Sequence, residues 1–291
     1  MKRCRSLLFM PGNNPGMLVS AQSLGADSVI FDLEDAVAQS EKDAARILVR
    51  NALLAVKPHG IPVIIRVNAL DTPYWRADIA AAVQGGADCI LAPKCSSVAY
   101  VQEMLDYLEQ EEQKQQSRQL EFIALVESAL GLENAFAMAS SHPRVAGLLL
   151  GAEDLTAELG ARRSPAGDEI FYARSRLLVA CRAAGIKAID SPYPFVTDLE
   201  GLEKDADFAA RLGFDGKALI SPHHVHLVNQ AFTPHEDQIR WARRVMVAAA
   251  RAKDEGKGAV SLDGMMIDLP VIKRAERILV LVDGYTEGEH A

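Results

Sequence analysis

The sequence lacks any run of eighteen apolar residues, so no segment of it is expected to span a bilayer. It also lacks an excess of positive charge, because 39 aspartates and glutamates against 31 lysines and arginines give a formal net charge of -8. This balance argues against nucleic acid or an anionic membrane as the main partner. The 4 cysteines form no C-x-x-C pair, and a chain of 291 residues does not need disulfide staples, so we expect reduced thiols in a cytoplasmic protein.

Short runs rich in β-branched and other aliphatic residues recur along most of the chain, separated by longer stretches with helical spacing. These runs are residues 6–12, 28–35, 62–68, 88–94, 121–128, 146–154, 186–192 and 216–222. Such alternation is typical of a parallel sheet covered by helices, and the number of runs predicts a closed (β/α)8 TIM barrel. A doubly wound open sheet is the alternative, but no G-x-G-x-x-G follows the first run.

The pattern changes after Pro234, where a long amphipathic helix is followed by a turn and another short helix. We therefore expect a catalytic barrel domain over residues 1–232 and a C-terminal helical extension over residues 233–291. The extension is too short for an independent core. It is expected to pack on the barrel rim or on a neighbouring subunit.

Polar side chains follow the predicted strands at the end where a barrel of this kind carries its reacting groups. They are Asp32, Glu34, Asp35, Arg66, Asn68, Lys94, Glu127, Glu153, Asp154, Asp190, Ser221 and His223. Charges inside an apolar barrel are unfavourable unless they are paired or bound to a metal. Because the carboxylates outnumber the lysines and arginines in this set, the pattern suggests a divalent cation.

Glu127 and Asp154 are the expected metal ligands, because they end consecutive strands that lie side by side. Two oxygen ligands, with no cysteine or histidine nearby and room for water, fit Mg²⁺ better than Zn²⁺. The alternative is that each carboxylate caps the helix that follows its strand.

The carboxylates of residues 32–35 end the second predicted strand, across the barrel mouth from Glu127 and Asp154. They could bind metal-bound waters and hold Arg66 in place. The planar guanidinium of Arg66 suits a carboxylate or a developing enolate. The alternative is a helix cap with salt bridges to Lys42 and Arg46, and a structural ion pair of Arg66 with these carboxylates is compatible with either role.

Eight motifs in order carry a family resemblance. They are "RSLLFMPGNNPGML", "GADSVIFDLEDAV", "IIRVNAL", "LAPK", "VESALGLENA", "GAEDL", "GFDGKALISP" and "GMMIDLP". Together they resemble the citrate lyase β-subunit and the citryl-CoA, malyl-CoA and citramalyl-CoA lyases of the HpcH/HpaI aldolase group. The resemblance runs from Arg5 to about Leu279.

The resemblance implies a (β/α)8 barrel with a C-terminal extension that binds Mg²⁺ through Glu127 and Asp154. It implies that Arg66 meets the thioester or enolate oxygen, with Asp32 and Glu34 counted beside it as catalytic residues. Asp268 in "MIDLP" matches a catalytic aspartate that relatives deliver into a neighbouring subunit's site, although by itself it looks like a helix N-cap.

We expect Arg5, at the start of the first motif, to bind substrate together with Arg66 and Glu127. The resemblance also implies a homo-oligomer, a trimer or a hexamer.

The reaction implied is Mg²⁺-dependent cleavage of a 3-hydroxyacyl thioester, of the citryl-CoA or citryl-carrier type, to an acetyl thioester and a 2-oxoacid such as oxaloacetate. Alternatives are a malyl- or citramalyl-CoA lyase, a metal-dependent aldolase on free hydroxy-oxoacids, and a subunit active only with an acyl carrier partner in a citrate lyase complex. Residues 220–222 of this chain read I-S-P, where relatives usually have I-H-P. The loop 188–205 also differs from that of the citrate lyase subunits. These departures bear on which acyl group is cleaved.

Overall fold

The computed structural model describes residues 4–254 and 260–286 of the chain. Within these residues the chain divides into two compact units, the first ending at Phe232 and the second beginning at Thr233. Each unit is described by itself below.

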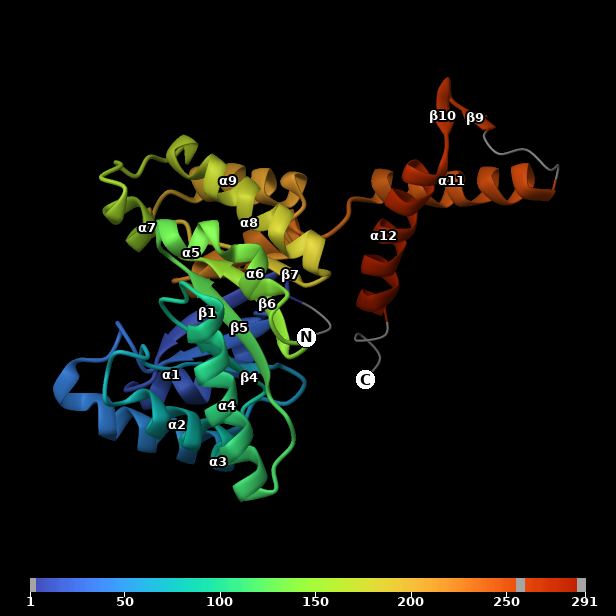
Figure 1. The fold of residues 1–291 in the computed structure, drawn as a ribbon. Coiled ribbons are helices and arrows are strands. Elements are labelled where there is room, and N and C mark those ends of the chain that lie inside the picture. Colours follow the sequence, from blue (N-terminus) through green and yellow to red (C-terminus); the bar gives the residue numbers. More distant parts are fainter. Residues whose placement is uncertain (1–3, 255–259, 287–291) are drawn as a thin grey trace. The chain divides into compact units, whose positions relative to one another are not determined.

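The first unit is built on a closed barrel of eight parallel strands (Figure 1). The strands are β1 (Ser6–Pro11), β2 (Ser28–Asp32), β3 (Val63–Arg66), β4 (Cys89–Ala92), β5 (Glu121–Val126), β6 (Val145–Leu150), β7 (Lys187–Asp190) and β8 (Gly216–Leu219). Each strand pairs with its neighbours in chain order, and β1 pairs with β8, with Ser6 opposite Lys217. The predicted TIM barrel is therefore confirmed, and the open-sheet alternative is wrong.

Helices follow the strands and surround the barrel (Figure 1). They are α1 (Pro15–Ser20), α2 (Lys42–Val56), α3 (Trp75–Gly85), α4 (Val98–Gln115), α5 (Ala129–Glu133), α6 (Ala135–Ala139), α7 (Ala152–Glu158), α8 (Phe171–Ala184), α9 (Leu199–Leu212) and α10 (Val225–Ala231). Short 3-10 helices cover Ala21–Leu24, Gln39–Glu41, Asp168–Ile170 and Pro222–His224. No helix in the described parts of the chain is both long and apolar enough to cross a membrane.

Two separate apolar clusters follow from the alternation of side chains along the strands. One cluster fills the barrel and takes every second residue, including Ile30, Ile64, Leu149 and Ile189. The other joins the outward-facing strand residues to the covering helices. A residue two positions after an interior one, at a strand end, therefore points toward the barrel mouth, whereas its immediate neighbour points toward the helices.

The second unit consists of α11 (Glu236–Asp254), the antiparallel pair β9 (Val260–Leu262) and β10 (Met265–Ile267), and α12 (Leu269–Thr286). The sequence pattern predicts only a turn between the helices, but the structure forms a hairpin there. Asp263 and Gly264 both have positive φ, 53° and 80°, as the two central residues of a type I′ turn do. A small cluster of Ala242, Val245, Ile267 and Ala275 holds the unit together.

Truncation of one interior side chain tests the barrel packing. Ile64→Ala removes a fully buried side chain and should lower the free energy of unfolding by about 2–5 kcal/mol, because a cavity remains. Ile47→Ala, on the exposed face of α2, should change it by less than about 0.5 kcal/mol. Urea unfolding followed by circular dichroism measures both variants. Equal losses would contradict the interior position of Ile64.

Candidate active site

A pocket of about 450 Å³ opens at the carboxyl ends of the barrel strands. Its wall is formed by residues at or just after the ends of seven of the eight strands, all except β4, and by the first turn of α7. The lining residues are Phe9, Met10, Pro11, Asp32, Asp35, Ala36, Arg66, Leu125, Glu127, Leu149, Leu150, Gly151, Ala152, Glu153, Asp154, Pro192 and Ile220. The structure therefore brings six of the charged residues predicted from strand ends into one pocket: Asp32, Asp35, Arg66, Glu127, Glu153 and Asp154.

Arg66 is held at one wall of this pocket by Asp32. The two residues are directly opposite each other on β2 and β3. The Arg66 Nε donates to Asp32 Oδ1 at 2.7 Å and Nη2 donates to Oδ2 at 2.6 Å. Burial alone would lower the pKa of Arg66, but hydrogen bonds and charge interactions with Asp32 and its neighbours raise it instead. The guanidinium is a fixed cation whose plane is set by the bidentate pair.

Asp32 has little capacity left for a further ligand. Besides Arg66, its Oδ1 accepts from the backbone N–H of Glu34 at 2.8 Å and its Oδ2 from that of Ala36 at 3.1 Å. These two bonds stabilise the turn after β2 and do not cap a helix, because the next helices, at Gln39–Glu41 and Lys42–Val56, have Ala38 and Glu41 as N-caps without a side-chain bond. The helix-cap part of the alternative for residues 32–35 is therefore wrong. The salt bridges in that alternative are wrong, because Lys42 donates to the carbonyl oxygens of residues 33 and 34, and Arg46 pairs with Asp43 and Asp78.

Glu34 lies behind Arg66 and is not part of the pocket lining. It is buried, its Oε2 is 3.1 Å from Arg66 Nη1, and neither carboxyl oxygen accepts a hydrogen bond from a described residue. Burial, and then the charges of Asp35, Glu127 and Asp32, raise the pKa of Glu34 to about 8, although Arg66 opposes the shift. A catalytic role for Glu34 stays a prediction, and its position limits that role to acting through Arg66.

Glu127 lies on the other side of the pocket, at the end of β5. Its Oε1 accepts the backbone N–H of Lys94 at 2.6 Å, and Lys94 adopts a left-handed backbone conformation with φ of 54°. Burial first, and then the nearby Asp154 and Asp35 carboxylates, raise the pKa of Glu127 to about 7. The alternative that Glu127 caps the next helix is wrong, because Ser128 is the N-cap of α5 and accepts from Gly131 N.

Asp154 lines the pocket from the first turn of α7 and forms no hydrogen bond or ion pair with another described residue. Gly151 provides the space between its helix and Glu127, since a Cβ at position 151 would lie 2.5 Å from Glu127 Cβ and 2.8 Å from Oε2. The two carboxylates thus face one cavity, and neither forms an ion pair with a described lysine or arginine, although Arg66 lines the same cavity. In the described ranges no set of three or more histidine, cysteine or acidic side chains could hold a metal, so any ion here would take two carboxylates and otherwise water or substrate.

Arg5 was expected to bind substrate, and the structure corrects this. It precedes β1 and pairs with Asp27, which precedes β2, through Nε to Oδ2 at 2.8 Å and Nη2 to Oδ1 at 2.7 Å. Both residues therefore lie at the amino ends of the strands, whereas the pocket is at the carboxyl ends. The motif indicated that Arg5 is next to a strand, but it did not show that Arg5 lies at the amino end of that strand, away from the pocket.

Asp268 belongs to the second unit. Its Oδ1 accepts from Val271 N at 3.3 Å, so it caps the N-terminus of α12, as its sequence position suggested. Its catalytic role stays a prediction.

Several other strand-end residues point away from the pocket. Asn68 is buried against Asp78, Ser221 caps the short helix at Pro222–His224, and Asp190 faces the covering helices. For Asp190 the alternation was a usable signal, because Ile189 is interior and its neighbour must face outward. Sequence reasoning missed Pro192 in the pocket wall and the backbone contact from Lys94 to Glu127.

A closed barrel with an arginine and facing carboxylates around a pocket at its carboxyl end is the arrangement of a TIM-barrel enzyme. Comparison with known proteins gives the family, because the model described as "HpcH/HpaI aldolase/citrate lyase" matches residues 5–222. The chain belongs to this family of lyases.

Three relatives show how far the similarity extends. The citrate lyase subunit beta of Leuconostoc mesenteroides subsp. cremoris is 42% identical over 282 residues, 96% of this chain and 93% of that protein. The (3S)-malyl-CoA thioesterase of Cereibacter sphaeroides is 37% identical over 264 residues, 91% of this chain and 89% of that protein. The crystal structure of CitE from Mycobacterium tuberculosis, in complex with magnesium, acetoacetate and coenzyme A, is similar with a TM-score of 0.80 and 33% identity, covering 97% of this chain and 100% of that one.

The unusual pKa of Glu34 has a consequence for stability. The folded state holds a proton on Glu34 up to pH of about 8, whereas an ordinary glutamic acid releases it near 4.5. Between these values the folded state binds more protons than the unfolded state, so stability falls as pH rises across the window. Glu34→Gln should remove this loss and stabilise the protein above pH 8 by on the order of 1 kcal/mol, with no gain below pH 5.

Thermal unfolding in EDTA across this pH range measures the effect. Asp35→Asn, which changes an exposed neighbouring carboxylate, is the control and should not flatten the profile. A Glu34→Gln profile parallel to that of the wild type would show that Glu34 ionises normally.

Proposed function

We propose that this chain is a Mg²⁺-dependent carbon–carbon lyase that cleaves a 3-hydroxyacyl thioester, of the citryl type, to an acetyl thioester and a 2-oxoacid such as oxaloacetate. The observation that carries the proposal is the pocket itself, in which Glu127 and Asp154 face a cavity shared with the fixed guanidinium of Arg66. The citrate lyase subunit beta relative supports the citryl thioester as substrate. The CitE structure supports magnesium and coenzyme A as its partners.

Glu127 and Asp154 fit Mg²⁺ on the chemistry of the donor set. Both are carboxylates and both line the pocket, and Asp154 has no partner among the described residues. Burial, and after it the charge of Asp154, raises the pKa of Glu127 to about 7. When bound, Mg²⁺ would lower the pKa of the substrate hydroxyl and orient the oxygens of the 2-oxoacid part. The backbone N–H of Lys94 holds Glu127 Oε1, which leaves Oε2 on the Gly151 side for this purpose.

Arg66 stabilises the negative charge that develops during cleavage. As the carbon–carbon bond breaks, its electron pair moves to the thioester carbonyl and forms an enolate. The bidentate pair with Asp32 fixes the guanidinium before the reaction, so little reorganisation is needed. Glu34 supports Arg66 from behind. By resemblance, Asp268 of a neighbouring subunit would protonate the enolate carbon, in a trimer or hexamer.

A second candidate is hydrolysis of a malyl thioester, which the malyl-CoA thioesterase relative favours. The two candidates differ in their products. A lyase releases a 2-oxoacid and an acetyl thioester, whereas a thioesterase releases free coenzyme A and an intact hydroxyacid.

A cleavage assay on citryl-CoA, malyl-CoA and citramalyl-CoA separates these possibilities. We expect release of a 2-oxoacid from citryl-CoA with Mg²⁺, and at least a hundredfold lower rate with EDTA, because the carboxylates alone cannot supply the electrostatic stabilisation. Free coenzyme A without 2-oxoacid would support the thioesterase instead. Release only after addition of an acyl carrier protein loaded with the same acyl group would support a subunit of a citrate lyase complex.

Replacement of the two carboxylates tests the ion-binding role. Glu127→Gln and Asp154→Asn should each weaken Mg²⁺ or Mn²⁺ binding by roughly tenfold or more, because each removes a charged ligand. Glu121→Gln, at the other end of β5, is the matched control and should bind the ion as the wild type does. Isothermal titration with the metal alone gives the result without turnover. Unchanged affinity in both variants would place the ion elsewhere.

Arg66→Lys keeps the charge but removes the planar fork that Asp32 holds. We expect kcat to fall by about 10²–10³, the usual loss when one fixed donor to a developing oxyanion is removed, with a smaller effect on KM. Arg76→Lys, on the exposed surface of α3, should retain wild-type kcat. A fall in Arg66→Lys confined to KM would show that Arg66 binds substrate without stabilising the transition state.

A further inference from the structure

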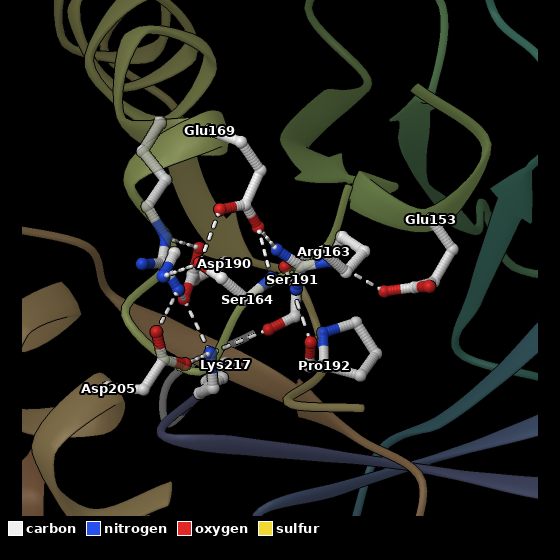
Figure 2. Close-up of polar contacts among 11 residues, drawn as sticks. Glu153, Arg163, Ser164, Glu169, Asp190, Ser191, Pro192, Asp205 and Lys217 are labelled. Carbon is white, nitrogen blue, oxygen red and sulfur yellow. Dashed lines mark hydrogen bonds and ion pairs between the residues drawn. The ribbon is translucent and has the colours of Figure 1, made fainter. Parts of the chain in front are cut away.

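Four buried charges form a cluster beside β7 and β8 (Figure 2). Lys217 is fully buried on β8, and its Nζ lies 2.6 Å from Asp190 Oδ2 and 2.6 Å from Asp205 Oδ2. Arg174 on α8 donates through Nε and Nη2 to Asp190, at 2.9 Å each, and through Nη2 to Asp205 on α9 at 2.6 Å. The two cations and two carboxylates balance.

The cluster lies outside the barrel and cannot touch a substrate in the pocket. Ile189 and Ala218 belong to the interior cluster, so their neighbours Asp190 and Lys217 face the covering helices. None of the four residues lines the pocket. The lysine is also not a candidate for a Schiff base, because the three N–H groups of an ammonium match its three acceptors, Asp190, Asp205 and a backbone carbonyl.

That third acceptor connects the cluster to the pocket. Lys217 Nζ donates to the carbonyl oxygen of Ser191 at 2.7 Å, and Pro192, the next residue, lines the pocket (Figure 2). Ile220, three residues after Lys217, lines it as well. The Lys217 ammonium on β8 therefore fixes the backbone at Ser191, which carries Pro192 into the pocket wall after β7. The adjoining residue of the wall, Ile220, follows β8 itself.

The wall formed by Pro192 and Ile220 belongs to the side of the pocket that carries no charged group. The polar groups proposed to hold the thioester oxygen and the 2-oxoacid oxygens come from β2, β3, β5 and α7. Pro192, Ile220 and the β1 residues Phe9, Met10 and Pro11 are apolar and form the remaining side. Under the proposed function this side is left for the carboxymethyl, methyl or hydrogen substituent of a citryl, citramalyl or malyl group. A small shift of such a wall changes the ratio of kcat/KM values between substrates whose substituents differ only in size, such as hydrogen, methyl and carboxymethyl.

A buried ionic cluster is a poor way to gain stability, because desolvation of its charges offsets their attraction. What it provides here is a donor of fixed position, since Lys217 is held from two sides by carboxylates that Arg174 also holds. An apolar residue at position 217 could fill the same space but could not fix the Ser191 carbonyl.

We propose that Lys217 is a positioning residue that sets acyl-group selectivity by holding the Ser191–Pro192 wall of the pocket. The proposal rests on the proposed function for the identity of the substrates. Its structural part, the hold on residues 191–192, does not depend on turnover.

The test uses a variant that keeps the charges balanced. Lys217→Met alone would leave a buried carboxylate uncompensated and could prevent folding. Lys217→Met combined with Asp205→Asn removes one charge of each sign and keeps the Arg174–Asp190 pair. Asp205→Asn alone is the matched control, because Lys217 still contacts Asp190 and Ser191. It leaves one buried cation without a carboxylate, so circular dichroism first establishes that it folds, and Pro192→Ala, which leaves every charge in place, tests the wall independently. Pro192→Ala changes the wall directly without touching the cluster.

The measured quantity is the ratio of kcat/KM between the best and the poorest of the three CoA thioesters, which is independent of the fraction of active enzyme. The double variant and Pro192→Ala should each reduce this ratio by roughly tenfold, and Asp205→Asn should leave it within about twofold. The ratio of affinities for oxaloacetate, pyruvate and glyoxylate in Mg²⁺ gives the same comparison without turnover. A purely structural role of Lys217 would lower all rates together and leave the ratio unchanged, which would overturn the proposal.

Amide hydrogen exchange of a peptide covering residues 190–197 provides the independent measurement. Exchange there should be at least roughly tenfold faster in the double variant than in Asp205→Asn, because only the double variant frees the Ser191 carbonyl. Equal exchange and equal ratios in the two variants would assign the effect to Asp205 and overturn the proposal for Lys217. A wild-type protein that neither cleaves the thioesters nor binds the oxoacids would overturn the proposed function, and the exchange result then decides whether Lys217 holds the wall.

Discussion

The alternation of side chains along the eight barrel strands is the constraint on which the rest of the structure depends. In a closed parallel barrel, one set of side chains fills the interior and the other packs against the helices. The same alternation continues past the strand ends. It directs Asp32, Arg66 and Glu127 into the mouth of the barrel, and it directs Asp190 and Lys217 into the layer of helices. A single residue of slip in any strand would exchange the two sets.

The charges sorted in this way meet different partners. Arg66 and Asp32 satisfy each other at one wall of the pocket, so this pair is complete before any ligand arrives. The Arg174 and Lys217 cluster is complete as well, with each carboxylate shared between two cations. Glu127 and Asp154 are different, because neither forms an ion pair with a described residue, although Arg66 lines the same pocket. Burial, followed by the charge of Asp154, raises the pKa of Glu127 despite the opposing charge of Arg66. The place for a cation is therefore identified by the two carboxylates that lack an ion pair, Glu127 and Asp154, and not by buried charge in general.

Much of the fold followed from local pattern. The strand runs and their spacing were sufficient for the barrel, because a parallel strand buried on both sides is a short continuous apolar segment that is easy to recognise. The hairpin at residues 260–267 was missed although Asp263-Gly264 is a typical type I′ turn sequence, since the flanking strands are only 3 residues long. Arg66 and Glu127 could be selected because they end or directly follow strands. Asp154 was expected at a strand end as well, but β6 ends at Leu150 and Asp154 lies in the first turn of α7. Arg5 could not be judged correctly from a motif alone, because a motif does not show which end of the barrel its residue occupies.

The sequence by itself determined the family, the order of strands and helices, and the identity of the residues that carry charge at the strand ends. The family followed from the resemblance of eight motifs, and the order of elements followed from periodicity along the chain, and both are properties of local sequence. Only the tertiary structure decided which of those charges meet one another. It showed that Asp32 is already occupied by Arg66, that Glu34 lies behind the pocket, and that Lys217 reaches the backbone beside Pro192. Each of these contacts joins elements far apart in the sequence, and their distances are fixed by closure of the barrel rather than by any pattern within one segment.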